Sequence, residues 1–152
     1  MALRIGAGDV EHIHDHAKEA YPEECAGAIV GMDTGDMKIV VDVWRAKNTH
    51  EEDRGRRFLI EPLQIKEFEE RTQERDMDLL GFYHSHPDHP AQPSQYDLDH
   101  AWPTFAYIIV AVMNGIATDS TVWFLKDDRS SFEEGTLHGE NPHSDTAQAV
   151  HR

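Results

Sequence analysis

The sequence predicts an α/β (α+β) domain in which helices pack on a β-sheet. Apolar, β-branched runs are interspersed with charged helical segments along the 152 residues, without a strict strand-helix-strand alternation. The hydrophobic content of 39% and the charged content of 28% are close to globular averages, which argues against wholesale disorder. We expect one domain over residues 1–137 and a polar, mobile tail over 138–152.

The first elements are a helix and a hairpin. Apolar residues at helical intervals follow Asp9, a candidate N-cap, and predict a helix over residues 10–20. Two apolar, β-branched runs predict strands over 25–32 and 37–45. Gly35 lies between them and can supply the positive φ of a tight turn, so we expect the two strands to form a hairpin.

The second half of the chain predicts more strands around two helices. RRFLIE, residues 56–61, predicts a third strand, and Pro62 opens a charged helix over 62–77. LLGFYHSH predicts a strand, and SQYDLDHAW predicts a short helix with Ser94 as its N-cap. The remaining predicted strands are FAYIIVAV at 105–112, STVWFLK at 120–126 and an edge strand within 131–137.

The composition argues against nucleic acid and membrane as partners. The formal net charge of −15, from 14 basic and 29 acidic side chains, opposes binding to a polyphosphate backbone. No apolar run approaches the ~18 residues that a membrane span needs. The single cysteine, Cys25, cannot close an intrachain disulfide, and the N-terminus lacks the pattern of a secretion signal. We therefore expect a soluble, cytoplasmic protein.

The segment HSHPDH satisfies two metal-site patterns at once. Read as H-x-H-x-D-H, it supplies His84, His86, Asp88 and His89. This is the opening ligand run of the metallo-β-lactamase fold hydrolases, which hold two metal ions.

The longer segment HSHPDHPAQPSQYD fits H-x-H-x(7)-S-x-x-D, the pattern of a single-zinc peptidase. Alternate side chains of a strand share one face, so His84 and His86 can grip one ion. A proline-stiffened loop then leads to Asp97 on the first turn of the short helix. Two histidines, one carboxylate and an open fourth position form the usual catalytic zinc site, where bound water approaches a neutral pKa.

A zinc hydrolase also needs a general base and a group that stabilises the oxyanion. Ser94 can cap the short helix, or its hydroxyl can donate a hydrogen bond to the oxyanion. Within the whole motif we favour the second role. For the base, Glu23 and Glu24 stand where the first helix gives way to the first strand. The sequence alone does not bring either acid beside His84.

The full pattern resembles that of the JAMM, or MPN-type, zinc metallopeptidases. Their motif is a glutamate in an E-x-x-G context, far upstream of H-S/T-H-P and then S-x-x-D. This chain has ECAG from Glu24, HSHP from His84 and SQYD from Ser94. The E-x-x-G context favours Glu24 over Glu23. The resemblance implies the MPN/JAMM fold, a mixed curved β-sheet with packed helices that is similar to cytidine deaminases.

The resemblance also implies a role for each residue of the motif. His84, His86 and Asp97 would bind one catalytic Zn²⁺. Glu24 would act as general base, and Ser94 would steady the tetrahedral intermediate. The implied reaction is hydrolysis of a peptide or isopeptide bond at the C-terminal Gly-Gly end of a ubiquitin-like or sulfur-carrier β-grasp protein. We expect such a protein as substrate, and a homodimer is a further expectation.

The segment after the motif resembles the compact, stand-alone prokaryotic members. Deubiquitinating members carry an extra loop between the metal aspartate and the next strand. Here only HAWPT separates Asp99 from the strand that begins near Phe105. Some of the compact members release cysteine or another small group from a sulfur-carrier protein.

Three other interpretations stay open. The metallo-β-lactamase pattern needs further ligands well downstream, and little chain follows His89. RadC-type proteins carry a similar pattern, but they usually have asparagine where this chain has Ser85. A metal-bound MPN interaction module without peptidase activity is the third.

Two features outside the motif have simpler interpretations. In HIHDH, His12 and His16 lie one helical turn apart and offer an adventitious metal site, but we favour a solvated helix face. We expect Cys25 to pack as a small, buried apolar residue.

Overall fold

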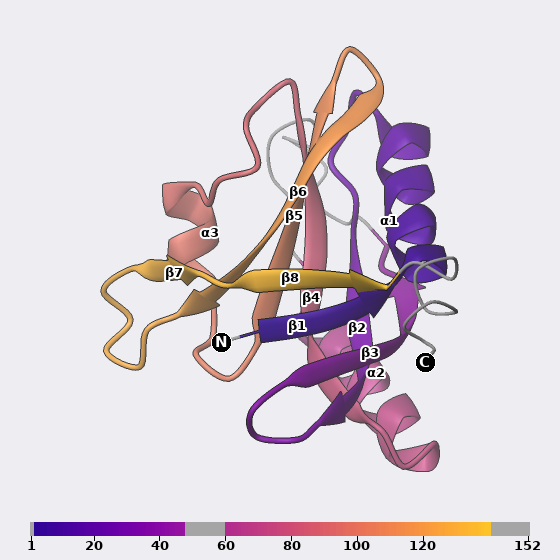
Figure 1. Cartoon of the computed structure of the whole chain (residues 1–152), viewed down its shortest axis with the longest axis vertical. Helices are drawn as coiled ribbons and strands as arrows, with labels where there is room; N and C mark the ends of the chain where they lie inside the picture. The colour runs from indigo at the N-terminus through magenta and orange to yellow at the C-terminus, as the bar shows by residue number, and fades with distance from the viewer. Residues whose placement is uncertain (1, 48–59, 141–152) are drawn as a thin grey trace.

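The computed structural model describes residues 2–47 and 60–140, and within them eight strands form one sheet. The strand order is β7-β6-β5-β4-β2-β3-β1-β8 (Figure 1). No helix in the described ranges is long and apolar enough to cross a membrane. The elements are β1 (Ala2–Gly6), α1 (Ala7–Ala20), β2 (Ala26–Asp33), β3 (Lys38–Arg45), α2 (Pro62–Glu74), β4 (Asp78–Pro87), α3 (Gln95–Asp99), β5 (Ala106–Met113), β6 (Ile116–Leu125), β7 (Phe132–Glu134) and β8 (Thr136–Glu140).

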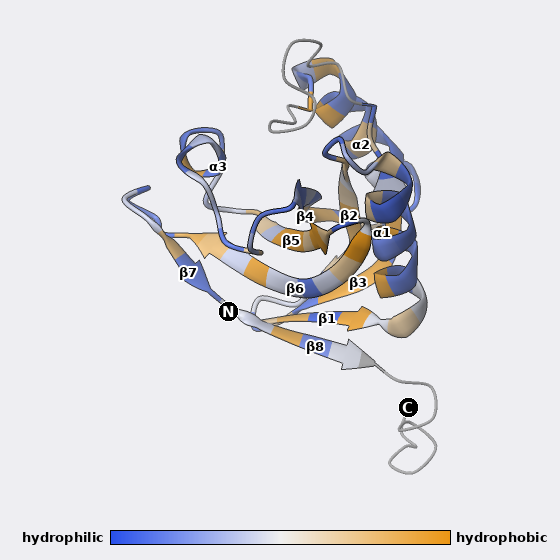
Figure 2. Ribbon diagram, turned by 90° about the horizontal axis from the view of Figure 1, so that it is seen from above, coloured by the Kyte–Doolittle hydropathy of each residue, from blue (hydrophilic) through white to orange (hydrophobic). Residues whose placement is uncertain are grey.

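The sheet is mixed and strongly curved. β4 pairs with β5 in parallel, and β1 pairs in parallel with both β3 and β8. The other neighbours pair antiparallel. The curvature brings β6 into contact with β8, so the sheet is nearly closed, as Figure 2 shows from above. The predicted α/β class, with a curved mixed sheet and packed helices, is confirmed.

α1 and α2 cover opposite faces of the centre of the sheet. Ile13 and Ala17 of α1 belong to one buried core, and Phe68 of α2 belongs to another. Successive residues of a strand point to opposite faces, so Tyr83 of β4 joins the first core and Phe82 joins the second. β4 is therefore packed on both sides, which makes it a rigid support for whatever its last residues carry.

The N-terminal end of the fold differs from the sequence prediction. α1 begins at Ala7 and its N-cap is Gly6, which has no side-chain cap bond. The prediction of Asp9 as N-cap is therefore wrong; Asp9 lies in the first turn, where a carboxylate suits the positive end of the helix dipole. β1 is missing from the sequence prediction, because five residues carry little periodicity and its partners lie far along the chain.

The later elements follow the prediction more closely. The hairpin of β2 and β3 is confirmed, with Gly35 at a φ of 93° between them, and α2 has Pro62 at its start. β8 continues to Glu140, so the expected domain limit at residue 137 falls inside a strand. The rest of the expected tail lies outside the described residues. Most of the strand expected over 56–61 also lies outside the described residues. Its last two residues, 60 and 61, precede α2 and are not part of a strand.

Candidate active site

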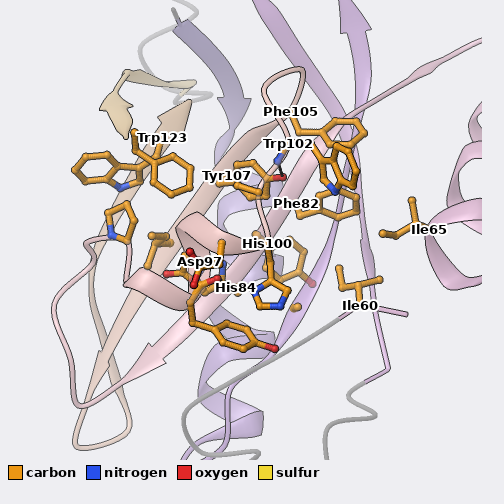
Figure 3. A pocket seen from close by; sticks show the side chains of 18 of the residues that line it. Ile60, Ile65, Phe82, His84, Asp97, His100, Trp102, Phe105, Tyr107 and Trp123 are labelled. Atoms are coloured by element: carbon orange, nitrogen blue, oxygen red, sulfur yellow. Dashed lines mark hydrogen bonds and ion pairs between the residues drawn. The ribbon is translucent and has the colours of Figure 1, made fainter. Parts of the chain in front are cut away.

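The three predicted metal ligands meet at the end of β4. The Nε2 atoms of His84 and His86 lie 3.1 Å apart. Asp97 reaches them from α3, with Oδ1 3.2 Å from Nε2 of His84 and Oδ2 3.2 Å from Nε2 of His86. Figure 3 shows His84 and Asp97 side by side among the side chains that line a pocket. Among the residues that the structure describes, this is the group of three that could hold a metal ion.

Asp97 is held in place by the start of its own helix. Ser94 Oγ accepts a hydrogen bond of 3.1 Å from the backbone N–H of Asp97. In return, Oδ2 of Asp97 accepts one of 2.8 Å from the backbone N–H of Ser94. This reciprocal capping box satisfies two N–H groups that the start of a helix leaves without partners. A helix as short as α3 is not stable alone, so it depends on the capping box. The same box fixes the direction of the Asp97 carboxylate.

The hydrogen bonds of His86 determine which ring nitrogen carries its proton. Nδ1 lies 2.9 Å from the carbonyl oxygen of Pro90, which can only accept, so Nδ1 is the donor. In the neutral ring Nε2 is then a bare lone pair. That lone pair faces a carboxylate oxygen of Asp97 at 3.2 Å. Two acceptors so close require a cation between them, either a proton or a metal ion.

The spacing of the two histidine nitrogens fits two corners of a small tetrahedral ion. With zinc-ligand bonds of about 2.0–2.1 Å, neighbouring corners of the tetrahedron lie about 3.3 Å apart. The two histidine nitrogens lie 3.1 Å apart, close to this value, and each of them lies 3.2 Å from a different oxygen of the Asp97 carboxylate. Two imidazoles and one carboxylate leave a fourth corner open, which is typical of catalytic rather than structural zinc sites.

The Asp97 carboxylate stays ionised at this site. Burial alone would raise the pKa of its carboxyl group. His84, His86 and the backbone N–H of Ser94 outweigh that cost, and they hold the pKa of Asp97 well below its usual range. An ionised carboxylate is the form that coordinates a divalent cation.

The strand that follows the predicted general base lies directly beside β4. β2 and β4 are antiparallel, with Ala26 opposite His84. The backbone N–H of Ser85 donates a hydrogen bond of 3.1 Å to the carbonyl oxygen of Cys25, so the pairing extends one residue beyond β2. Continued by one further residue, the same register puts position 24 opposite His86. Residues opposite each other in an antiparallel pair point to the same face.

Of the two candidate acids, Glu24 is the one at the ligand-bearing end of β4. It is only 7% exposed, whereas Glu23 is exposed. A buried carboxylate whose position lines up with His86 suits a group that acts beside the candidate ligands. An exposed one before a strand suits a surface acid.

Asp88 and His89 lie outside the ligand group. The carboxylate of Asp88 accepts hydrogen bonds from the Tyr21 hydroxyl at 2.7 Å and from the backbone N–H of Asn114 at 2.9 Å. His89 is exposed. Asp88 therefore anchors its loop to neighbouring segments, and the two-metal interpretation loses the ligands it required.

The histidines of HIHDH attach α1 to the sheet. His14 Nε2 lies 2.8 Å from Ser120 Oγ, and His16 Nδ1 lies 2.7 Å from the Tyr83 hydroxyl. Both side chains are half-buried, and only His12 is exposed. The solvated helix face predicted from the sequence is therefore wrong for His16. Burial, followed by the nearby Arg45, lowers the pKa of His16 to about 4, so its ring is neutral near pH 7.

Cys25 packs as predicted. Its side chain is 2% exposed within the core beneath α1, and its thiol is not in a disulfide. Burial raises the pKa of the thiol to about 11, so the reactive thiolate is not populated at neutral pH.

A cavity of about 730 Å³ opens beside the ligands. His84 and Asp97 form part of its wall, and aromatic side chains are the most numerous kind among the other lining residues (Figure 3). The backbone N–H of Trp102 donates to the Tyr107 hydroxyl at 2.8 Å, which ties the loop after α3 to β5. The aromatic lining residues are Phe82, Tyr83, Tyr96, Trp102, Phe105, Tyr107, Trp123 and Phe132. The sequence prediction missed this cavity, because its walls come from segments that only the fold brings together.

The fold and the site define a class: a curved mixed α/β sheet whose central strand ends in a His-His-Asp group that could hold one metal ion. Residues 7–126 match the family described as prokaryotic homologues of the JAB domain. The chain belongs to that family, and the predicted kinship with stand-alone JAMM/MPN proteins is confirmed.

Sequence and structural similarity to individual proteins supports this family assignment. A desampylase from Haloferax volcanii is 30% identical over 112 residues, which span 70% of this chain and 78% of that protein. The solution structure of a protein from Desulfitobacterium hafniense is 25% identical, with a TM-score of 0.76 over 94% of this chain and 97% of that one. A JAB1/MPN domain protein from Archaeoglobus fulgidus shares the fold at 20% identity, with a TM-score of 0.59 over 93% and 100% of the two chains.

Proposed function

We propose that this protein is a zinc-dependent metallopeptidase. Its substrate would be a peptide or isopeptide bond at the C-terminal Gly-Gly end of a ubiquitin-like or sulfur-carrier β-grasp protein. The observation that carries the proposal is the convergence of His84, His86 and Asp97 on a point that could hold a metal ion. The similar desampylase supports the reaction class, since its name denotes removal of a ubiquitin-like SAMP protein from conjugates.

Glu24 is the proposed general base. Zinc, when bound to the three ligands, would supply the Lewis acidity that polarises a carbonyl and acidifies water. Glu24 would take the proton released by the attacking water and pass it to the leaving amine. Its burial and the β2-β4 register support this role, because a base must lie beside the reacting atoms without being one of the ligands.

Ser94 is the proposed donor to the oxyanion. Its oxygen accepts the capping bond through a lone pair, which leaves the O–H proton able to donate elsewhere. Capping and catalysis are therefore compatible in one side chain. The capping box also ties Ser94 to Asp97, so the donor would keep a constant position relative to the metal.

The aromatic cavity is the proposed seat of the substrate's C-terminal segment. The cavity adjoins His84 and Asp97, so a chain lying in it would present its last carbonyl to the ligand group. Phe82, Trp102 and Tyr107 supply apolar surface that would bury the side chains before the Gly-Gly end. An extended tail could also pair with backbone at the rim of the sheet, as strand-like ligands do.

Incubation with candidate substrates tests the proposal. The zinc-loaded protein is mixed with Gly-Gly-ending β-grasp proteins that carry a lysine isopeptide, a linear fusion or a single C-terminal amino acid. Intact mass spectrometry should show that one class loses its leaving group and regains a free C-terminal carboxylate.

Two variants distinguish the base from the ligands. Glu24→Gln should keep stoichiometric zinc by elemental analysis but lose roughly 10²- to 10⁴-fold in kcat, the usual contribution of a general base. His86→Ala should lose both zinc and turnover. Normal turnover by Glu24→Gln would mean that the base is wrongly assigned. A fully active, zinc-free wild-type protein would refute the metal site itself.

The homodimer and the cytoplasmic location expected from the sequence stay predictions. Light scattering coupled to size-exclusion chromatography measures the first, and cell fractionation measures the second.

A further inference from the structure

Ser85 lies on the face of β4 opposite the two histidines, and it hydrogen bonds to the backbone of Cys25, the residue after Glu24. Ser85 lies between the two histidine ligands, points away from them and is 1% exposed. Its Oγ accepts a hydrogen bond of 2.9 Å from the backbone N–H of Cys25. Its own N–H donates one of 3.1 Å to the carbonyl oxygen of Cys25. One serine thus binds both main-chain polar groups of the residue that follows Glu24.

The hydrogen bond to the Ser85 side chain replaces a backbone hydrogen bond that a regular antiparallel pair would have at Cys25. In a regular antiparallel pair, the two residues exchange N–H and C=O bonds through their backbones. Here the N–H of Cys25 turns to the Ser85 hydroxyl oxygen instead. Cys25 is 2% exposed, so this N–H has little access to water, and leaving it unbonded would be destabilising.

A second close contact between the same two segments lies at Gly27, two residues after Cys25. Gly27 is paired with Tyr83, and a Cβ atom on Gly27 would overlap the Tyr83 ring and the carbonyl oxygen of Trp44. The Tyr83 hydroxyl is in turn bonded to His16 of α1 at 2.7 Å. The glycine of E-x-x-G thus makes room for a ring that α1 holds in place.

We propose that Ser85 is a positioning residue for Glu24. The N–H of Cys25 belongs to the planar peptide group that leaves the Cα atom of Glu24. Holding that N–H fixes the plane and, with it, the direction in which the Glu24 side chain leaves the backbone. Ser85 therefore sets the position of the Glu24 carboxylate relative to His86 from the opposite side of the sheet. The inference rests on the proposed role of Glu24 as the general base.

Three variants test this role. Ser85→Ala removes the acceptor, and Ser85→Thr retains it. Thr72→Val serves as the matched control, because it removes another buried hydroxyl, which donates to the Glu69 carbonyl oxygen at 2.7 Å on α2. Steady-state kinetics, zinc affinity by competition with a chelating dye, and amide hydrogen exchange of Cys25 are measured for each.

The expected pattern separates positioning from general stability. Ser85→Ala should lower kcat roughly 10- to 100-fold, as loss of a supporting hydrogen bond typically does, with KM and zinc affinity unchanged. The Cys25 amide should exchange faster in that variant. Ser85→Thr should restore kcat and slow exchange, and Thr72→Val should match the wild type in both. If Ser85→Ala does not fold, Ser85→Cys replaces it, since a thiol fills the space but accepts hydrogen bonds weakly.

Two results would overturn the role of Ser85. The first is unchanged kcat in a variant whose Cys25 amide exchanges faster. The second is a zinc affinity that falls in step with kcat, because Ser85 would then act through the histidines. If the wild type cleaves none of the conjugates, the proposed function fails instead. Crystal structures of the zinc-loaded wild type and Ser85→Ala then decide: a displaced Glu24 carboxylate supports positioning, and superimposable carboxylates overturn it.

Discussion

The side chains of Ser94 and Asp97 each accept a hydrogen bond from the other residue's backbone N–H. The capping box sets the start of α3, the direction of the Asp97 carboxylate and the location of the Ser94 hydroxyl. The sequence alone allows Ser94 to cap the helix or to donate to an oxyanion, and the whole motif favours the second role. The capping role is observed, and the proposed catalytic role is compatible with it, because the cap uses only the oxygen's lone pair.

Substitutions at Ser94 should separate these two roles. Ser94→Ala loses both, so it should reduce the free energy of unfolding by about 0.5–2 kcal/mol and kcat by about 10²- to 10³-fold. Ser94→Asp keeps a good cap without a hydroxyl donor, so it should regain stability but not kcat. Ser94→Thr should regain much of both. Urea unfolding and steady-state kinetics measure the two effects, and wild-type turnover by Ser94→Asp would exclude the donor role.

At the scale of elements, α1 is attached to the sheet by histidines as well as by apolar packing. Ile13 and Ala17 bury its inner side, while His14 and His16 bond to Ser120 of β6 and Tyr83 of β4. The pKa of His16 is lowered to about 4 from an ordinary value of 6.5, and burial is the main cause. The attachment therefore depends on a neutral ring.

This attachment should make stability depend on pH. Between pH 6.5 and about 4 the unfolded chain binds a proton on His16 that the folded chain does not bind. The contribution of His16 is complete above pH 6.5 and is lost as the pH falls through this window. His16→Gln, which can still hydrogen bond to Tyr83, should therefore lose less stability than the wild type between pH 7 and pH 5. Urea unfolding at both pH values measures the difference, and equal losses would contradict the assignment.

At the scale of the whole molecule, the predictable elements were those with signals inside their own sequence. Gly35 indicates the hairpin turn, Pro62 indicates the start of α2, and the H-x-H spacing indicates two candidate ligands on one face of β4. β1 has no such signal. Its position depends on parallel pairing with residues 38–39 and with residues 136–140, and both lie far away along the chain.

The same distinction applies to the site. His84, His86 and Asp97 belong to one short stretch, so spacing was enough to predict that they meet. The location of Glu24 depends on the β2-β4 register, and the aromatic cavity depends on strands from β4 to β7 and on the loop after α3. Such long-range pairings have no local signature, so only the folded structure reveals them.

If zinc binds at the proposed site, it should stabilise the whole fold, because the three proposed ligands come from β4 and α3, which come together only on folding. A free zinc concentration of about 100 times Kd should add about 2.7 kcal/mol to the free energy of unfolding. Differential scanning calorimetry should therefore show a higher Tm after zinc addition and a lower one after chelation. His86→Ala should show neither shift, and an equal shift in that variant would indicate zinc binding elsewhere.

The parallel pairing of β1 with β8 has a consequence during synthesis. On the ribosome, β1 emerges before the other described strands, but one of its two partners is among the last described residues to be made. Until β8 arrives, the nascent protein carries an unpaired β1 edge, a template for pairing with a neighbouring chain. Polypeptides stalled before residue 136 should therefore be clients of chaperones.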